Sequence, residues 1–461
     1  MKKPRPWIFY ALAVVLAGPA WLAFRFNPAA ARSATGFVSH SLCSGVFVSG
    51  LAAGRVYADS LKSLKEIADM VPVLGYEVDT GRREVKARLF GRFESVAVFR
   101  DGLGCLVLRG DPPPASPAPA SPATRQAPAL PEIAGASLVE PAAPGLRAAL
   151  DHAFEESRKD ALRRTAAVVV VQDGRIVAER YAAGYGIATP LLGWSATKSV
   201  VNALIGLLAH QGKLSIDAPA PVSQWRQPND PHQAVTIDHL LRMTSGLDVS
   251  ETNKDFDAVS QMLFNERDTA AFAERAGLKA APGTQWEYTS GNTIVLSRII
   301  RDAVGGNAAG VRAFAQRELF EPLGMRNVTL EFDATGTPLG STYLFASARD
   351  WARFAMLYLD DGVIGGRRLL PEGWVRYSST RTLDSPYAAG FWLGSAAWRK
   401  RWGIPGDAFF ASGFLGQRIM VIPSERMVVA RFGNASGPGF DAEGFGRLVS
   451  DVRETLGLRK Q

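Results

Sequence analysis

Ser195 and Lys198 lie three residues apart in the stretch GWSATKSVVNALIG, Gly193–Gly206. Apolar residues follow them at helical spacing, which predicts a buried helix that begins beside the serine. Residues three apart share one face of a helix, so the Lys198 amine can reach back to the Ser195 hydroxyl. The partial positive charge at a helix N-terminus and burial both favour a neutral lysine amine, and that charge also favours an oxyanion on the serine. This pattern indicates a nucleophile and its proton acceptor.

The same stretch also permits a purely structural interpretation. Ser195 would then cap the helix, and Lys198 would point into solvent. Histidine is the more usual proton acceptor for a serine, but none of the histidines stands in a recognisable triad setting. These are His40, His152, His210, His232 and His239. A Gly-x-Ser-x-Gly turn is absent, because Thr197 stands where its second glycine would be. A Ser-x-x-Lys match is weak evidence by itself, so this stretch alone leaves both interpretations open.

Four further segments follow in order along the chain. They are IDHLLRMTSGL (Ile237–Leu247), APGTQWEYTSGNTIVL (Ala281–Leu296), STYLFASARDWARFAMLYLDDGVIGGRRLLPEGWV (Ser341–Val375) and ASGFLGQRIMVIPSERMVVA (Ala411–Ala430). Together with Ser195 and Lys198, they make the chain resemble the serine hydrolases related to class C β-lactamases. That family includes penicillin-binding DD-peptidases, esterases and the 6-aminohexanoate-dimer hydrolases, and the chain looks nearest to the last branch. The resemblance covers about Pro144 to Leu456.

The resemblance implies that Tyr288, in the segment PGTQWEYTS, is a third catalytic residue. A phenol near a lysine ammonium loses its proton more readily, and it can then act as general base and later return the proton. The family often has Asn two residues after this tyrosine. Here that position holds Ser290, and Asn292 stands two residues further on. Which of these two side chains polarises the bound substrate stays open.

The third motif of the family usually has Lys or His two residues before a Gly on an edge strand. Here it is Ala411-Ser412-Gly413, without the cationic side chain. In β-lactam recognition that side chain helps to hold the substrate carboxylate, so its absence counts against a β-lactamase or DD-peptidase and fits a neutral or cationic substrate. The resemblance also implies that the backbone N–H groups of Ser195 and Phe414 form an oxyanion hole, with Ser412 and Gly413 beside the substrate.

Aromatic residues near these motifs are candidates for the substrate pocket: Trp194, Trp286, Trp392 and Phe414. The turn MTSGL offers Ser245 as a second nucleophile, but in the family this turn lies in the helical region and frames the cleft. The resemblance therefore implies a structural role for Ser245.

These residues predict an exported serine hydrolase that cleaves an amide or ester bond through an acyl-enzyme on Ser195. Lys198 and Tyr288 would transfer the protons, and the substrate would be a small molecule or a short peptide-like compound. The alternatives are a DD-peptidase, a β-lactamase, or a catalytically inactive protein of the same fold that binds cell-wall peptides or serves as a scaffold. No metal or other cofactor is expected, because the sequence has no metal-ligating motif. The sequence leaves the oligomeric state open.

The overall composition is that of a globular protein. Apolar residues make up 47% and charged residues 21% of the 461 residues. The formal charge is +8 and the pI is near 9.5, but Lys and Arg do not cluster with interleaved aromatic residues. A nucleic-acid partner is therefore not expected.

The N-terminus carries a targeting pattern. Lys2, Lys3 and Arg5 precede an uncharged stretch at Trp7–Phe24, which is just long enough to span a bilayer. Residues 1–33 are therefore expected to be a membrane anchor or signal segment. Residues 7–24 would anchor the chain in the inner membrane, with the catalytic domain in the periplasm. Cleavage near residues 29–31, followed by secretion, is the second choice.

Residues 34–110 predict a small α/β module of unknown role, with strand-like segments VKARLF and ESVAVFR and one helix at Ala58–Val71. Cys43 and Cys105 are the only cysteines, and in an exported protein they would pair across this module or remain as two buried thiols. Residues 111–143, rich in Pro and Ala, predict a semi-rigid linker. It would hold the module tens of ångströms from the rest of the chain.

Residues 144–461 predict the hydrolase domain. Strand-like runs around Asp173-Gly174 indicate one hairpin, and Gln417–Gly433 indicates another. Helical and loop segments lie between them from about residue 236 to 374. Strands at both ends predict an α/β (α+β) fold of the β-lactamase/transpeptidase-like type, with an antiparallel sheet flanked by helices plus an all-helical region.

Overall fold

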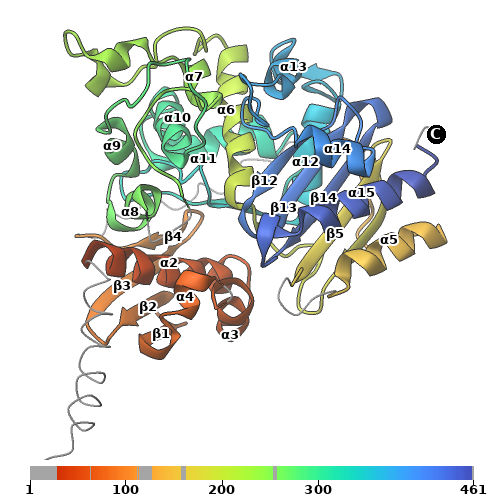
Figure 1. Cartoon of the computed structure of the whole chain (residues 1–461), viewed down its shortest axis with the longest axis horizontal. Helices are drawn as coiled ribbons and strands as arrows, with labels where there is room; N and C mark the ends of the chain where they lie inside the picture. The colour runs from red at the N-terminus through yellow and green to blue at the C-terminus, as the bar shows by residue number, and fades with distance from the viewer. Residues whose placement is uncertain are drawn as a thin grey trace, which may run out of the picture.

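The computed structural model describes residues 28–62, 64–111, 113, 127–156, 162–252 and 257–458. The predicted membrane segment at residues 7–24 lies outside these ranges. Within them, no helix is both long and apolar enough to cross a bilayer. A small N-terminal module lies against one end of a larger domain (Figure 1).

A five-stranded antiparallel sheet forms the centre of the larger domain. Its strands lie in the order β12 (Phe409–Gly413), β13 (Gln417–Ile422), β14 (Met427–Gly433), β5 (Thr165–Gln172) and β6 (Arg175–Tyr181). Both predicted hairpins are present. Asp173 and Gly174 connect β5 to β6 with φ angles of 48° and 80°, as a two-residue hairpin turn requires. The sheet joins distant segments of the chain, which confirms the predicted fold.

Helices cover both faces of this sheet, and the strand β5 shows why its sequence is apolar throughout. Val168 and Val170 pack with α5 (Pro144–Phe154) and α15 (Ala442–Thr455). The alternate residues Val169 and Val171 join a larger core on the other face, to which α6 (Thr197–His210) and α12 (Ala348–Leu359) contribute. Successive side chains of a strand point to opposite faces, so burial on both sides leaves no polar positions.

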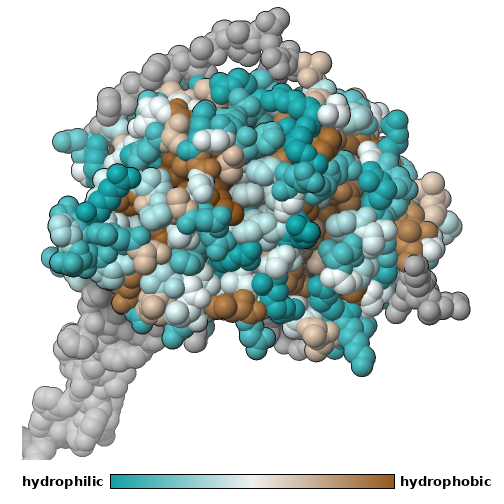
Figure 2. All heavy atoms as spheres, turned by 90° about the horizontal axis from the view of Figure 1, so that it is seen from above, coloured by the Kyte–Doolittle hydropathy of each residue, from teal (hydrophilic) through white to brown (hydrophobic). Residues whose placement is uncertain are grey.

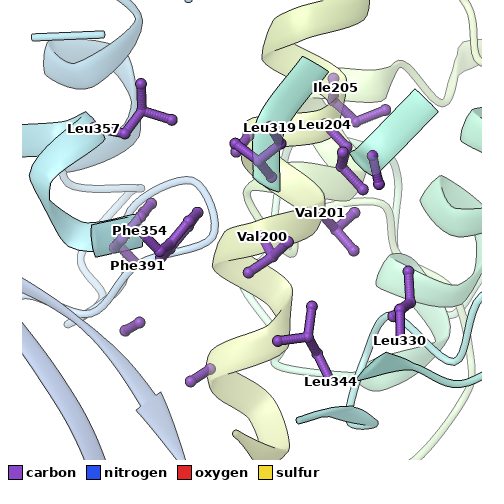
Figure 3. Packing of buried hydrophobic residues seen from close by; sticks show 14 of the residues in the cluster. Val200, Val201, Leu204, Ile205, Leu319, Leu330, Leu344, Phe354, Leu357 and Phe391 are labelled. Carbon is purple, nitrogen blue, oxygen red and sulfur yellow. The ribbon is translucent and has the colours of Figure 1, made fainter. Parts of the chain in front are cut away.

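The predicted helix after Ser195 is α6, and it runs through the centre of the larger core. Its apolar side chains contact neighbours on two sides (Figure 3). Val200, Val201, Leu204 and Ile205 from α6 lie among Leu319, Leu330, Leu344, Phe354, Leu357 and Phe391, all of them buried. A helix surrounded in this way is apolar on most of its circumference.

The helical region and the remaining short elements complete the domain. Its helices are α7 (Ile237–Leu241), α8 (Ala258–Asn265), α9 (Thr269–Glu274), α10 (Ser290–Ala303), α11 (Ala308–Ala315), η6 (Gln316–Phe320), α13 (Trp374–Ser379) and α14 (Ala396–Trp402). One small sheet has the order β7 (Leu191–Leu192), β9 (Leu344–Ala346), β8 (Val328–Leu330), and another pairs β10 (Val363–Ile364) with β11 (Arg367–Arg368). The face seen from above is largely hydrophilic, with hydrophobic residues in small separate areas (Figure 2).

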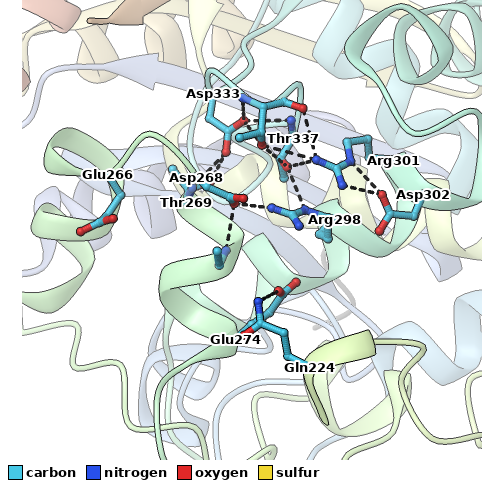
Figure 4. Close-up of polar contacts among 12 residues, drawn as sticks. Gln224, Glu266, Asp268, Thr269, Glu274, Arg298, Arg301, Asp302, Asp333 and Thr337 are labelled. Atoms are coloured by element: carbon cyan, nitrogen blue, oxygen red, sulfur yellow. Dashed lines mark hydrogen bonds and ion pairs between the residues drawn. The ribbon is translucent and has the colours of Figure 1, made fainter. Parts of the chain in front are cut away.

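A buried carboxylate fixes α9 and α10 relative to one another. Asp333 accepts hydrogen bonds from the Thr269 backbone N–H at 3.0 Å and from the Thr269 hydroxyl at 2.8 Å. Arg298 of α10 reaches both Asp268 and Thr337 in the same network (Figure 4). These contacts connect α9 to the middle of α10, the helix whose first residue is Ser290.

The N-terminal module is a four-stranded antiparallel sheet covered by one long helix. The strands are β1 (Leu74–Asp79), β2 (Glu84–Leu89), β3 (Phe93–Arg100) and β4 (Gly104–Val107), and the helix is α2 (Pro28–Phe47). The strands predicted in the module are present as β2 and β3. The helix α2 was not predicted, and it begins inside the segment assigned to the anchor. Cys43 of α2 and Cys105 of β4 form a disulfide bond.

The single helix predicted at Ala58–Val71 is broken. The chain forms short pieces instead: α3 (Ala53–Val56), the π-helical turn η1 (Tyr57–Leu61), α4 (Lys65–Ala68) and the 3₁₀ turn η2 (Val71–Val73). Leu61 and Ile67 are both buried in the module core. Positions six apart on one continuous helix are about 120° apart around its axis, so the break lets both side chains face that core.

The module docks directly on the hydrolase domain, so the predicted separation of tens of ångströms is wrong. Val38 and Leu42 share one apolar core with Phe264, Tyr343 and Phe345 of the larger domain. The end of the predicted linker also packs on that domain, because Leu130 and Ile133 are buried in its core. The Pro/Ala-rich composition of the segment gave no sign that Leu130 and Ile133 pack in the core of the domain.

Candidate active site

The serine lies on a strained turn that leads into α6. Ser195 belongs to the 3₁₀ turn η3 (Trp194–Ala196), and Trp194 has a φ of 49°, which non-glycine residues rarely adopt. A Cβ atom on Gly193 would lie 2.2 Å from the ring of Trp351, so only glycine fits there. Ser195 is therefore partly exposed at the start of a buried helix.

The Lys198 amine is enclosed by three oxygen atoms. Its Nζ lies 3.1 Å from the Ser195 Oγ, 3.0 Å from the Ser290 Oγ and 3.0 Å from the Ser341 carbonyl oxygen. The side chain is 2% exposed, so the alternative of a solvent-exposed lysine is wrong. Burial lowers the pKa of Lys198 to about 8, against the opposing charge of Glu251. The amine can therefore be neutral close to neutral pH and accept a proton from Ser195.

The phenol of Tyr288 is the third group at this point. Its ring centroid lies 4.8 Å from Lys198 Nζ. Burial raises the pKa of Tyr288 well above its usual value, and the charge of Glu251 and the neighbouring Tyr387 act in the same direction, while a hydrogen bond with Ser195 opposes them. This direction disfavours loss of the phenol proton and suits a group that donates or relays a proton.

The first turn of α10 separates the roles of Ser290 and Asn292. The Ser290 hydroxyl accepts from Lys198, and its backbone N–H donates to the Glu251 carboxylate. Asn292 instead accepts a hydrogen bond of 2.5 Å from the buried Ser245 hydroxyl. Of the two candidates, Ser290 therefore lies at the nucleophile, and Asn292 holds the turn that contains Ser245.

The edge strand β12 passes close to the turn that carries the serine. A Cβ atom on Gly413 would lie 2.1 Å from the Gly193 carbonyl oxygen and 3.0 Å from the Trp194 Cβ. The next residue, Phe414, begins the turn η7 (Phe414–Gly416), and its ring lies 5.3 Å from that of Trp194. The predicted oxyanion segment therefore reaches the nucleophile because residue 413 has no side chain. Ala411 is buried in β12 and Ser412 is half-buried.

Two of the candidate pocket aromatics support Tyr288. Trp392 lies 5.2 Å from the Tyr288 ring and 6.3 Å from Trp286 between ring centroids. Trp194 and Phe414 line the cavity at Ser195, whereas Trp286 and Trp392 are not among its lining residues. Trp392 therefore packs against the Tyr288 ring directly, and Trp286 packs against Trp392.

A cavity of about 140 Å³ opens beside the serine. Ser195, Trp194, Ser290, Phe414 and Glu251 contribute to its lining. Sequence reasoning missed Glu251, which follows the MTSGL turn without any motif of its own. Among the residues that the structure describes, no group of three or more His, Cys, Asp or Glu side chains is placed to hold a metal ion.

A family model described as Beta-lactamase matches residues 150–452. The chain belongs to the β-lactamase family. A 6-aminohexanoate-dimer hydrolase of Paenarthrobacter ureafaciens is 25% identical over 312 residues, which are 63% of this chain and 76% of the relative.

Solved structures share this β-lactamase fold. A penicillin-binding protein homologue from Caulobacter crescentus has a TM-score of 0.55 at 18% identity and covers 70% of this chain and 100% of its own. A family VIII carboxylesterase has a TM-score of 0.54 at 16% identity, with the same coverage.

The region matched to the β-lactamase family leaves out the N-terminal module, yet this module contributes to the cavity. Phe37, Leu64, Glu66 and Ile67 all line it. Sequence reasoning did not find these residues. The signal that was present is the spacing of Val38 and Leu42, four residues apart beside Phe37. This spacing is compatible with a helix but says nothing of what that helix covers.

Proposed function

We propose that this member of the β-lactamase family is a serine hydrolase that cleaves an amide or ester bond through an acyl-enzyme on Ser195. The observation that carries the proposal is the buried Lys198 amine at 3.1 Å from the Ser195 hydroxyl. A lysine held in this way has a lowered pKa and gives the serine a proton acceptor inside the protein.

The reaction begins when Lys198 takes the Ser195 proton and the serine oxygen bonds to the substrate carbonyl carbon. The negative charge that develops on the carbonyl oxygen is held by the backbone N–H groups of Ser195 and Phe414. The bond to the leaving amine or alcohol then breaks, and the leaving group receives a proton through the Tyr288 hydroxyl. In the second half, water attacks the acyl carbon and gives its proton to Lys198 and Tyr288. The bond between the acyl carbon and the Ser195 oxygen then breaks, the serine oxygen takes that proton back, and the acid leaves.

Substrates without a carboxylate at the third motif fit best. Ala411 supplies no cation for a substrate carboxylate, and Glu251 places a negative charge beside the cavity. These features favour linear amides or esters over β-lactams and D-Ala-D-Ala peptides.

An exported location fits the same proposal. Residues 7–24 would anchor the chain in the inner membrane with the hydrolase domain in the periplasm, and the Cys43–Cys105 disulfide supports an oxidising compartment. N-terminal sequencing of the protein from membrane and soluble fractions distinguishes this arrangement from cleavage and secretion.

A fluorophosphonate probe tests the nucleophile and separates the hydrolase from an inactive protein that binds cell-wall peptides. We expect the probe to add its mass to the peptide that contains Ser195, because only an activated serine reacts with it. The peptide that contains Ser223, an exposed serine on η4 (Ser223–Arg226), should stay unmodified. A protein that shows no label at Ser195 would favour the binding protein.

A further inference from the structure

We propose that the N-terminal module forms one wall of the substrate cavity and limits which group of the substrate enters it. This inference rests on the proposed function and deepens it. The cavity then selects a short apolar group without negative charge on one side of the scissile bond.

The first support is the position of the module. The helix α2 lies between its own sheet and α8 of the hydrolase domain (Figure 1). The neighbours of Phe37 on this helix, Gly36 and Val38, are buried, whereas Phe37 itself is partly exposed and lines the cavity. The Phe37 ring lies 6.2 Å from the ring of Trp194, the residue before the nucleophile.

The second support is that this wall is held firmly. A Cβ atom on Gly36 would lie 2.9 Å from the Phe264 Cβ, so α2 and α8 are in close contact one residue before Phe37. Asn265 of α8 also donates a hydrogen bond of 2.9 Å to the Ser33 hydroxyl. A side chain on a helix fixed in this way defines the size of the cavity.

A buried carboxylate connects the module to the domain at a second place. Glu331 of the hydrolase domain is fully buried and accepts hydrogen bonds of 2.8 Å from the Ser44 hydroxyl and from the Cys105 backbone N–H. His40 Nε2 lies 3.0 Å from the second carboxylate oxygen. Separation of the module would leave these polar groups without partners in an apolar environment, which is costly.

The third support is the chemistry of the lining. Phe37, Leu64 and Ile67 from the module face Leu263 and Phe264 from the domain across an apolar space. An apolar cavity of roughly 150 Å³ accommodates a molecule the size of benzene. At about 140 Å³, the cavity therefore fits a group of about four to six carbon atoms.

Charge adds a second filter. Glu66 from the module and Glu251 from the domain both line the cavity, and the described part of its lining contains no Lys, Arg or His. Asp257 lines it as well but caps the first turn of α8. Glu66 has no hydrogen bond or ion pair within the described ranges. An anionic substrate group would meet these carboxylates at short range, which is unfavourable in an apolar space.

The test compares Phe37→Ala with Phe47→Ala in the full-length protein. Phe47 is a matched control, because it lies on the same helix, is also partly exposed and is not part of the cavity lining. The substrates are p-nitrophenyl esters with acyl chains from acetate to decanoate, and acetate esters of alcohols of the same lengths. These two series probe the two sides of the scissile bond.

In each series the measured quantity is the ratio of kcat/KM for the longest ester to kcat/KM for the four-carbon ester, which is the butyrate ester or butyl acetate. We expect Phe37→Ala to raise this ratio by at least about fourfold in one of the two series. Phe47→Ala should leave both ratios as they are in the wild type. Unchanged ratios in both series for Phe37→Ala, or an equal change in Phe47→Ala, would overturn the inference. Fluorophosphonate labelling of Ser195 in each variant distinguishes the two proposals. If Ser195 is labelled but the ratios do not change, only the role of the module in the cavity is refuted. If Ser195 is not labelled in the wild type, the proposed hydrolase function is refuted as well.

The charge filter has its own variant. Glu66→Gln should increase hydrolysis of the mono-p-nitrophenyl ester of a six-carbon dicarboxylic acid relative to the hexanoate ester by several-fold. Glu77→Gln, at an exposed glutamate of β1 in the same module, should leave that ratio unchanged. An unchanged ratio in Glu66→Gln removes the charge filter from the proposal.

Discussion

The environment of Lys198 decides what the pair of serine and lysine can do. Burial pushes the amine towards its neutral form, and the nearby Glu251 carboxylate pushes it back towards the charged form. Tyr288 experiences the same two influences, and both raise its pKa. These directions fit the proposal that the neutral lysine amine accepts the serine proton and that the phenol acts as the donor.

Activity should follow the protonation of Lys198. Because burial lowers its pKa to about 8 and only the neutral amine accepts a proton, kcat/KM for an ester should rise with pH through about 8 and then level off. Glu251→Gln removes the charge that raises this pKa, so the midpoint should move to lower pH. A pH–rate profile measures both. Glu372→Gln, at an exposed glutamate, is the control. A midpoint that is unmoved in Glu251→Gln would contradict this assignment.

At the scale of elements, the site depends on the close approach of β12 to the turn η3. This approach requires the absence of a side chain at Gly413, where a Cβ atom would lie 2.1 Å from a backbone oxygen. The strand β12 and the turn η3 lie far apart in the sequence, and the fold brings them into contact.

Gly413→Ala should therefore move the backbone N–H of Phe414, one of the two proposed oxyanion donors, away from Ser195. We expect kcat/KM to fall by about a hundredfold with the fold retained, since small displacements of reacting groups have effects of this size. Ester kinetics together with circular dichroism check this. Gly406→Ala is a matched control, because a Cβ atom there meets nothing within 4 Å. Equal activity of the two variants would show that the approach of β12 does not matter.

Local patterns predicted one hairpin of the central sheet and the helix that begins beside the nucleophile. The turn residues Asp173-Gly174 predicted the hairpin, and the spacing of apolar residues predicted the helix after Ser195. Both signals come from residues that are close together in the sequence. The helix α2 was missed because its sequence is rich in Gly, Ser and Thr, which favour helices poorly. Which of Ser290 and Asn292 lies beside the nucleophile could not be predicted, because it depends on their contacts with Lys198 and Ser245, which are distant in the sequence.

At the scale of the whole molecule, the module and the domain form one continuous structure. Sequence composition suggested a spacer between them, but burial of Leu130 and Ile133 and the core around Val38 bring the parts together. The contribution of Phe37 to the cavity depends on this docking, so it could not be predicted from the chain itself.

The disulfide should stabilise this arrangement. Cys43 and Cys105 are separated by 62 positions, and the loss of chain entropy for a loop of this size corresponds to about 4 kcal/mol of stabilisation. The double variant Cys43→Ala/Cys105→Ala should unfold at a lower temperature than the wild type in a thermal melt. Dithiothreitol should lower the wild-type midpoint and leave that of the double variant unchanged. A wild-type midpoint that is insensitive to dithiothreitol would contradict a stabilising role.

The most direct test of the account is the hydrolysis of p-nitrophenyl butyrate by Ser195→Ala. We predict that kcat falls by about 10⁴-fold or more, because the acyl-enzyme cannot form without the serine oxygen. Ser223→Ala should keep wild-type activity, and both variants should keep the wild-type melting temperature. Full activity in Ser195→Ala would contradict the assignment of Ser195 as the nucleophile and the mechanism built on it.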